Sequence, residues 1–283
     1  MKHMIRSSAL AATIINLIMF SFGVEASYSQ VSVAPSSVFI HGKGGIGNLY
    51  ITNNSSTPQE ISIDFTFGYP GADSAGNPVM NYNDTIAAQA YALNPFIKAY
   101  PKAFTLNPGE EQTVRFQVRT NGSVRNAFYF TRVKVTSNQK SAEIERKQSD
   151  SVAAQVRFRF NQILPVFYQK GDVSTGLTIH DVSTLINNDT LEAVADVERT
   201  GTAPFIGSVR AELFSPANER VALFESTISI YFRMKDKMEL DLSKAGKGPH
   251  RLVLTYETKR SDVSAEDLLQ TLPVSKEVTV NLP

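Results

Sequence analysis

One stretch of the chain, from Val152 to Tyr168, constrains the fold more than any other. Its middle alternates strictly between apolar and polar residues, which is the period of two expected of a β-strand. The apolar row is Ala154, Val156, Phe158 and Phe160, and the polar row is Gln155, Arg157, Arg159 and Asn161. A strand with one apolar face is half-buried. The apolar row therefore faces either this protein's own core or an apolar groove of another protein.

The sequence before this stretch predicts further short strands separated by turn-forming residues, which indicates an all-β fold. A first strand near residues 28–40 is interrupted at Pro35, and this favours an edge strand or a switch between sheets. Turn formers at residues 53–58 lie between two alternating segments and predict a hairpin. Residues 69–100 are less regular and are expected to be an insertion, with a short helix over the alanine-rich segment 85–93.

Length and the spacing of the strands predict two domains. The chain has 283 residues, which exceeds the roughly 100 residues of one immunoglobulin-like sandwich and suits two. Strand patterns restart after a short polar link, Gln169 to Asp172, and continue to Leu282. We therefore expect immunoglobulin-like domains at residues 27–168 and 173–283. Cysteine is absent, so both domains must be stabilised by packing and hydrogen bonds alone.

The first 26 residues have the pattern of a cleaved secretory signal. Basic residues at the start are followed by an apolar run from Ser8 to Gly23 and then by the small-x-small sequence Val24-Glu25-Ala26. An uncleaved membrane anchor is the competing interpretation, but the apolar run is short for a span. No later segment predicts stable membrane insertion. The formal net charge of +1 gives no reason to expect nucleic acid or an anionic membrane as a partner.

The sequence carries no recognisable catalytic or metal-binding motif. His41, His180 and His250 lack the spacing of metal ligands, and there is no nucleophile elbow or zinc-protease motif. The glycine-rich segment 41–47 resembles a phosphate-binding loop, but a strand pattern follows it where a helix would be needed, so we interpret it as a turn. These observations predict a protein that is not an enzyme and that needs no cofactor and no metal.

The order of motifs in the first half resembles that of periplasmic pilus-assembly chaperones of the chaperone-usher pathway. The motifs are P-x-x-F-x-L-x-P-G-x-x-Q-x-V-R-F at residues 101–116, a Phe-Tyr-Phe strand at 128–130, a polar loop at 137–150, and the closing I-x-P-V-F-Y at 163–168. The resemblance covers residues 31–168 and is weaker beyond. An Asn-Pro-Thr-Pro-like segment is absent, and Thr200-Gly201 in its place is similar to the archaic branch of the family.

The resemblance implies two immunoglobulin-like domains in an L-shaped arrangement, a periplasmic location, and two kinds of partner, pilus subunits and an outer-membrane usher. Such chaperones lend a strand to a subunit that lacks one. That strand here would be residues 152–162, with Ala154, Val156, Phe158 and Phe160 entering the subunit. Ser37 and Pro165 occupy the positions where the better known members hold the subunit's terminal carboxylate. Possible replacements are Arg132, Arg157, Arg159 and Arg115.

Two other interpretations remain open at this point. One is a structural pilus subunit or tip adhesin, for which residues 28–33 would be a donor arm. The length and the closing motif at 163–168 favour a chaperone over a subunit. The other is an enzyme or binding protein on a sandwich scaffold, for which the sequence shows no site.

Overall fold

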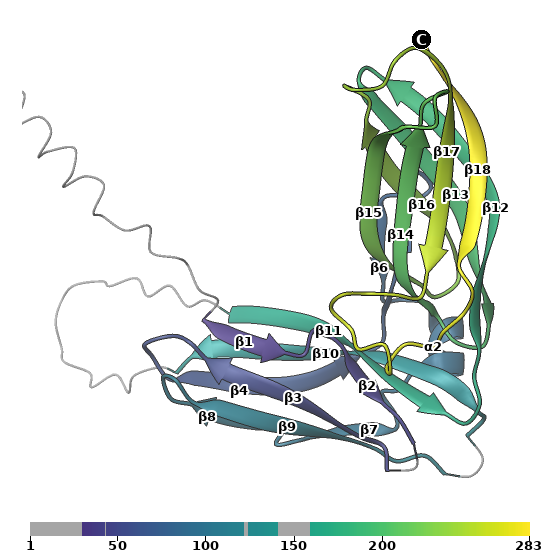
Figure 1. Ribbon diagram of the computed structural model, residues 1–283. Helices are drawn as coiled ribbons and strands as arrows, with labels where there is room; N and C mark the ends of the chain where they lie inside the picture. Colours follow the sequence, from purple (N-terminus) through teal and green to yellow (C-terminus); the bar gives the residue numbers. More distant parts are fainter. Residues whose placement is uncertain (1–29, 43, 122–123, 141–158) are drawn as a thin grey trace, which may run out of the picture.

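The computed structural model describes residues 30–42, 44–121, 124–140 and 159–283. These residues form two β-sandwiches that meet at an angle, so that the molecule has the shape of an L (Figure 1). The predicted fold class, two immunoglobulin-like sandwiches in an L-shaped arrangement, is confirmed. No helix within the described residues is long and apolar enough to cross a membrane.

The first sandwich consists of two sheets made by strands β1 to β4 and β7 to β11. One sheet has the order β1 (Val31–Ala34), β3 (Ile46–Asn53), β9 (Glu111–Val118) and β7 (Ile97–Tyr100). The other has the order β2 (Val38–Ile40), β11 (Arg159–Lys170), β10 (Ala127–Gln139), β4 (Gln59–Thr66) and β8 (Ala103–Leu106). All neighbours are antiparallel except β2 and β11, which run parallel.

The chain crosses between these two sheets three times from β1 to β4. At Pro35 it leaves β1 in one sheet and enters β2 in the other, so the predicted switch between sheets is confirmed. The hairpin predicted around residues 53–58 is wrong, because β3 and β4 belong to different sheets. Asn53 holds this corner: its buried side chain donates to the carbonyl oxygens of Thr57 at 2.9 Å and Leu106 at 3.0 Å. Turn residues alone do not distinguish a hairpin from a crossing between sheets.

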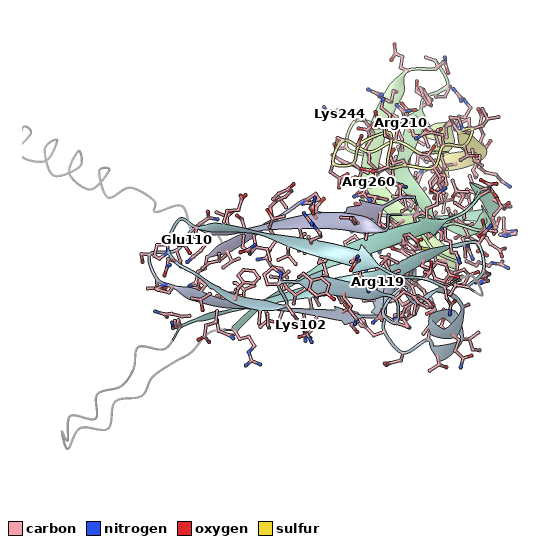
Figure 2. The ribbon with its side chains drawn as sticks, turned by 90° about the horizontal axis from the view of Figure 1, so that it is seen from below. Lys102, Glu110, Arg119, Arg210, Lys244 and Arg260 are labelled. Atoms are coloured by element: carbon pink, nitrogen blue, oxygen red, sulfur yellow. The ribbon has the colours of Figure 1, made fainter. Side chains whose placement is uncertain are left out.

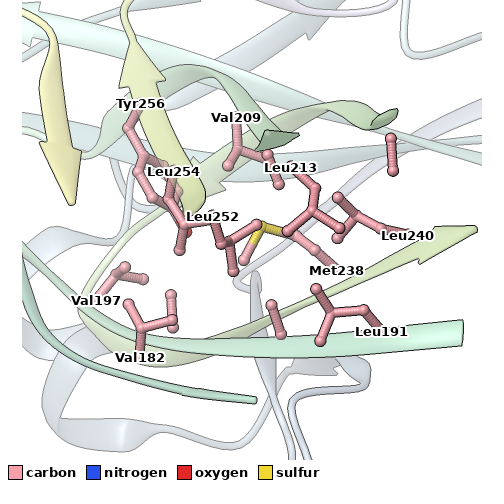
Figure 3. Close-up of a cluster of buried hydrophobic side chains, with 14 of the residues drawn as sticks. Val182, Leu191, Val197, Val209, Leu213, Met238, Leu240, Leu252, Leu254 and Tyr256 are labelled. Atoms are coloured by element: carbon pink, nitrogen blue, oxygen red, sulfur yellow. The ribbon is translucent and has the colours of Figure 1, made fainter. Parts of the chain in front are cut away.

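The second sandwich is made by seven strands of the C-terminal half. They are β12 (Thr175–Asn187), β13 (Thr190–Gly201), β14 (Phe205–Phe214), β15 (Arg220–Ile230), β16 (Arg233–Asp241), β17 (Gly248–Glu257) and β18 (Val274–Leu282). One sheet has the order β12-β13-β16 and the other β15-β14-β17-β18. Alternating side chains from both sheets interdigitate in an apolar core (Figure 3). Because β11 ends at Lys170 and β12 begins at Thr175, the domain division that we propose lies between them.

A carboxyl group faces this second core. The Asp236 side chain on β16 accepts a 2.8 Å hydrogen bond from the Tyr256 hydroxyl on β17 of the opposite sheet. Burial raises the pKa of Asp236 to about 6, and the hydrogen bond from Tyr256 only partly opposes this rise. An acid with a raised pKa in the folded state stabilises the fold when it is protonated.

An Asp236→Asn variant should therefore remove one part of the pH dependence of stability. In the wild type the contribution of Asp236 is complete below pH 4 and is lost as the pH rises through about 6. The asparagine keeps an acceptor for Tyr256 without a charge, so the variant should gain roughly 1–3 kcal/mol relative to wild type between pH 4.5 and pH 7.5. Urea unfolding of both proteins at the two pH values measures this difference. Equal pH dependence in both proteins would show that Asp236 is not the titrating group.

An insertion between β4 and β7 completes the fold. It contains a short hairpin, β5 (Tyr69–Ala72) and β6 (Pro78–Asn81), and the helix α2 (Thr85–Tyr91), so the predicted short helix is confirmed. The helix begins at Asp84, whose carboxylate accepts from the backbone N–H of Ala87 at 2.9 Å. In Figure 1, β6 and α2 lie at the junction of the two sandwiches.

Candidate functional site

Strand β11 is at the centre of the site because one of its edges is incompletely paired. On one side it pairs with β10 along its whole length, from Arg159 to Lys170. On the other side β2 pairs only with residues 166–168. Among the described strands, none pairs with residues 161–165 on that side. Backbone groups at an edge of this kind are a template for pairing with another strand.

The core-facing side chains of β11 form a row that runs from the interior of the first sandwich toward its end. Phe160, Gln162, Leu164, Val166 and Tyr168 share one face, since their spacing is two. Val166 is fully buried, Leu164 packs partly on the core, and Phe160 is 44% exposed. The Gln162 side chain donates to the carbonyl oxygen of Val31 at 2.7 Å. The apolar row therefore emerges from the core near Phe160.

The predicted donor residues are only partly within the described residues. Ala154, Val156 and Phe158 lie outside them, as does Arg157 among the candidate anchors. Phe160 is described, pairs with Ser137 of β10 and is exposed over nearly half of its surface. The assignment of residues 152–162 as a donor strand remains a prediction.

The opposite face of β11 turns toward the second sandwich. Ile163 on this face is 45% exposed, whereas Phe167 is buried at the junction of the two sandwiches. Pro165 lies between them and is the cross-strand neighbour of Arg132 on β10. The face beside the open edge thus has the exposed side chain of Ile163, and the buried Arg132 lies next to Pro165 on the neighbouring strand.

Arg132 is a buried cation without a carboxylate partner. It is only 9% exposed, and its Nε donates to the carbonyl oxygen of Gly68 at 3.2 Å. Within the described residues no Asp or Glu forms an ion pair with it. A buried guanidinium is costly unless an anion or several hydrogen bonds compensate for its desolvation. Arg132 is therefore suited to receive a carboxylate from another molecule.

A second arginine near this position is already neutralised. Burial raises the pKa of Tyr231 to about 12, and the positive charges of Arg132 and Arg260 oppose the rise. Arg260, on the second sandwich (Figure 2), binds Asp262 with two nitrogens at 2.8 and 2.5 Å. Arg132 is thus the member of this pair that lacks a carboxylate among the described residues.

The other two candidate anchors lie elsewhere. Arg159 is exposed at the start of β11, where its Nε donates to the Asn138 side chain at 3.3 Å. Arg115 is on β9, and its neighbours Val114 and Phe116 are buried, so Arg115 points outward from the other sheet. The structure therefore does not bring Arg115 to the surface that contains Arg132 and the edge of β11.

The aromatic junction between the sandwiches was not among the sites predicted from the sequence. Phe130 of β10 contacts Tyr231 of the second sandwich, with ring centroids 4.6 Å apart. Other rings that surround this contact are Phe67, Tyr69, Phe128 and Phe167. The signal was present: residues 127–130 are an uninterrupted apolar run, which is typical of a strand buried on both faces. The described residues contain no group of three or more His, Cys, Asp or Glu side chains that could hold a metal ion.

Comparison with known proteins gives similarity of structure only. No protein family and no curated protein matches the sequence. The solved structures to which the chain is similar include several pilus chaperones. The YadV chaperone aligns at a TM-score of 0.49 and 8% identity, covering 88% of this chain and 100% of that one.

Two further similar structures are complexes. One is the CsuC–CsuE chaperone–tip subunit complex of the archaic Csu pili of Acinetobacter baumannii, with a TM-score of 0.40, 12% identity and coverage of 74% and 90%. The other is the Salmonella enterica SafA pilin with the SafB chaperone, with a TM-score of 0.40, 13% identity and coverage of 89% and 98%.

Proposed function

We propose that this protein is a periplasmic chaperone that binds pilus subunits by strand addition and delivers them to an outer-membrane usher. The observation that carries the proposal is the edge of β11 at residues 161–165, beside an apolar row that leaves the core at Phe160. The motifs at residues 101–116 and 163–168 support it independently. Binding, and not catalysis, is the proposed activity.

Strand addition would act through two kinds of contact. Backbone hydrogen bonds along the edge set the register, and alternate side chains fill the groove of the partner. If the alternation continues upstream of Phe160, the row of Ala154, Val156 and Phe158 lies on the same face. Each fully buried Val or Phe contributes about 1.5–3 kcal/mol, so the row could stabilise a subunit that lacks part of its core. No nucleotide is needed for such an exchange of strands.

Arg132 is the residue that we propose as the anchor for the subunit's terminal carboxylate. A carboxylate that binds beside Pro165 would be next to the Arg132 guanidinium on the neighbouring strand. The pair would be shielded from water, where charge-assisted hydrogen bonds are strongest. Anchoring at one point of the strand would fix which subunit residues face Phe160 and Phe158.

Replacement of the apolar row tests the proposal. A Phe158→Asp, Phe160→Asp variant, co-expressed with a pilus subunit that the wild type binds, should recover less than about one tenth of the subunit recovered by wild type, because burying two unpaired carboxylates is strongly unfavourable. Ile46→Asp is the matched control, since Ile46 is 51% exposed on the other sheet. Subunit co-purification and circular dichroism are the measurements. Wild-type recovery by a folded double variant would exclude the donor-strand assignment.

A further inference from the structure

The insertion between β4 and β7 connects the two sandwiches, and we infer that residues 69–91 are a clamp that fixes the angle between them. The covalent connection between the sandwiches is the short segment between Lys170 and Thr175, and the aromatic junction around Phe130 and Tyr231 packs beside it. The insertion adds contacts with two strands of the second sandwich and with the loop between β15 and β16. These contacts are at the hairpin tip, the helix end and the hairpin base.

The tip of the hairpin lies against β16. The carbonyl oxygen of Ser74 accepts a 2.9 Å hydrogen bond from Lys235 Nζ. Gly76, with a φ of +87°, is so close that a Cβ atom there would be 3.0 Å from the Cβ of Lys237. Glycine is needed at this position both for its left-handed backbone and for the close approach.

The end of the helix is held by two arginines, one from each sandwich. Tyr91 lies between the guanidinium of Arg125, 4.9 Å from its ring centroid, and that of Arg199 on β13, 5.2 Å away. Arg199 also donates to the Tyr91 hydroxyl at 3.0 Å, and Arg125 donates to the carbonyl oxygen of Ala90 at 2.8 Å. Burial raises the pKa of Tyr91, but the two arginines outweigh it and lower the pKa overall.

The base of the hairpin connects the helix to the aromatic junction. The Tyr69 ring is 4.9 Å from Phe232 and 5.7 Å from Tyr231, both in the second sandwich. Its hydroxyl donates to the N-cap carboxylate of Asp84 at 2.5 Å, so the hairpin and the helix are linked to each other. Burial and the Asp84 carboxylate both raise the pKa of Tyr69, which remains a neutral donor at physiological pH.

The three contact regions differ in chemistry, and they lie on the neighbouring strands β13 and β16 and on the loop that precedes β16. The contacts extend along these strands from Lys237 to Arg199, so a rotation about the segment between Lys170 and Thr175 would have to break several of them. The clamp therefore restricts rotation as well as bending. This inference concerns the geometry of the free chain and does not depend on the proposed function.

A distance measurement between the far ends of the two sandwiches tests the clamp. The chain has no cysteine, so Thr105→Cys and Lys244→Cys provide two unique sites for spin labels. Both residues are exposed, one on β8 and the other beyond β16; Figure 2 labels Lys244. In the labelled protein, pulsed electron resonance should give one narrow distance distribution. The variant Tyr91→Ala with Arg199→Ala should give a distribution at least twice as wide.

Arg251→Ala is the matched control. Arg251 stacks over Phe214 at 4.6 Å within the second sandwich, which is the same type of contact away from the clamp. The distance distribution of the Arg251→Ala variant should equal that of the labelled wild type.

Circular dichroism and thermal unfolding show whether the Tyr91→Ala, Arg199→Ala variant is folded. The milder pair Tyr91→Phe and Arg199→Lys should broaden the distance distribution by a smaller amount. A wild-type width in a folded Tyr91→Ala, Arg199→Ala variant would overturn the inference.

Discussion

An Arg132→Met variant should fold like the wild type and bind a pilus subunit at least about 30-fold more weakly. Removing one partner of a buried charge pair costs about 2–5 kcal/mol, largely because the other charge is left without compensation. Methionine retains the length and apolar character of the arginine stem, and Arg132 is only 9% exposed, so the substitution preserves packing in a buried site. Binding of purified subunit, measured by its refolding yield and by titration, gives the change in affinity.

Lys134→Met is the control for a general loss of positive charge. Lys134 lies two residues further along β10 on the same face, and it is less buried than Arg132. Its substitution should change affinity less than about threefold. A synthetic peptide of the subunit's C-terminal strand provides a second test: wild type should prefer the free acid over the amide, and Arg132→Met should not distinguish them. If Arg132→Met still prefers the free acid as strongly as wild type does, the terminal carboxylate binds to a residue other than Arg132.

Replacing Phe116 with alanine should lower the free energy of unfolding by about 3–5 kcal/mol. Phe116 is on β9, is fully inaccessible to solvent, and packs edge-to-face on Phe65 of the opposite sheet with ring centroids 5.4 Å apart. The substitution leaves a cavity between the two sheets that the rigid strands cannot close. Because the chain has no disulfide to limit the unfolded state, nothing covalent offsets the loss. Urea unfolding followed by circular dichroism measures the change.

Tyr50→Ala is the matched comparison for Phe116→Ala. Tyr50 is an aromatic residue on the adjacent strand β3, and it is 42% exposed. Its removal should cost well under half as much, since 42% of its surface stays in water and no enclosed cavity is left between the sheets. Comparable losses for the two variants would show that the first core does not depend on the contact between Phe116 and Phe65.

Local alternation was sufficient to predict the strands but not how they pair. Ile61, Ile63 and Phe65 predicted β4 correctly, and the turn formers before it predicted a reversal of the chain. The same residues are compatible with a hairpin or with a corner that crosses between sheets. Hydrogen bonds from Asn53 to Thr57 and to the distant Leu106 select the corner. Such a contact joins residues far apart in the sequence, so no local pattern contains it.

The candidate site shows the same limit. The sequence indicated that Phe160 belongs to an apolar row, and it included Arg132 among four possible anchors without separating them. The choice between these arginines depends on which sheet each strand joins. Strand β10, with Arg132, lies beside β11, whereas β9, with Arg115, lies in the opposite sheet. The contact of Tyr91 with Arg125 and Arg199 was not predicted, because it unites three segments from two sandwiches.

Strand β10 is shared by two hydrophobic clusters, since Tyr129 and Val133 face the first core while Phe128 and Phe130 face the junction. Because both clusters depend on this strand, we expect the unfolding of one sandwich to lower the stability of the other. Loss of β10 would remove the first core and the support of Tyr231 in the same step, so unfolding of the N-terminal sandwich is transmitted to the boundary of its neighbour. The cooperative unfolding unit is therefore expected to be larger than either sandwich. It includes both hydrophobic clusters, because each one packs against a different face of β10.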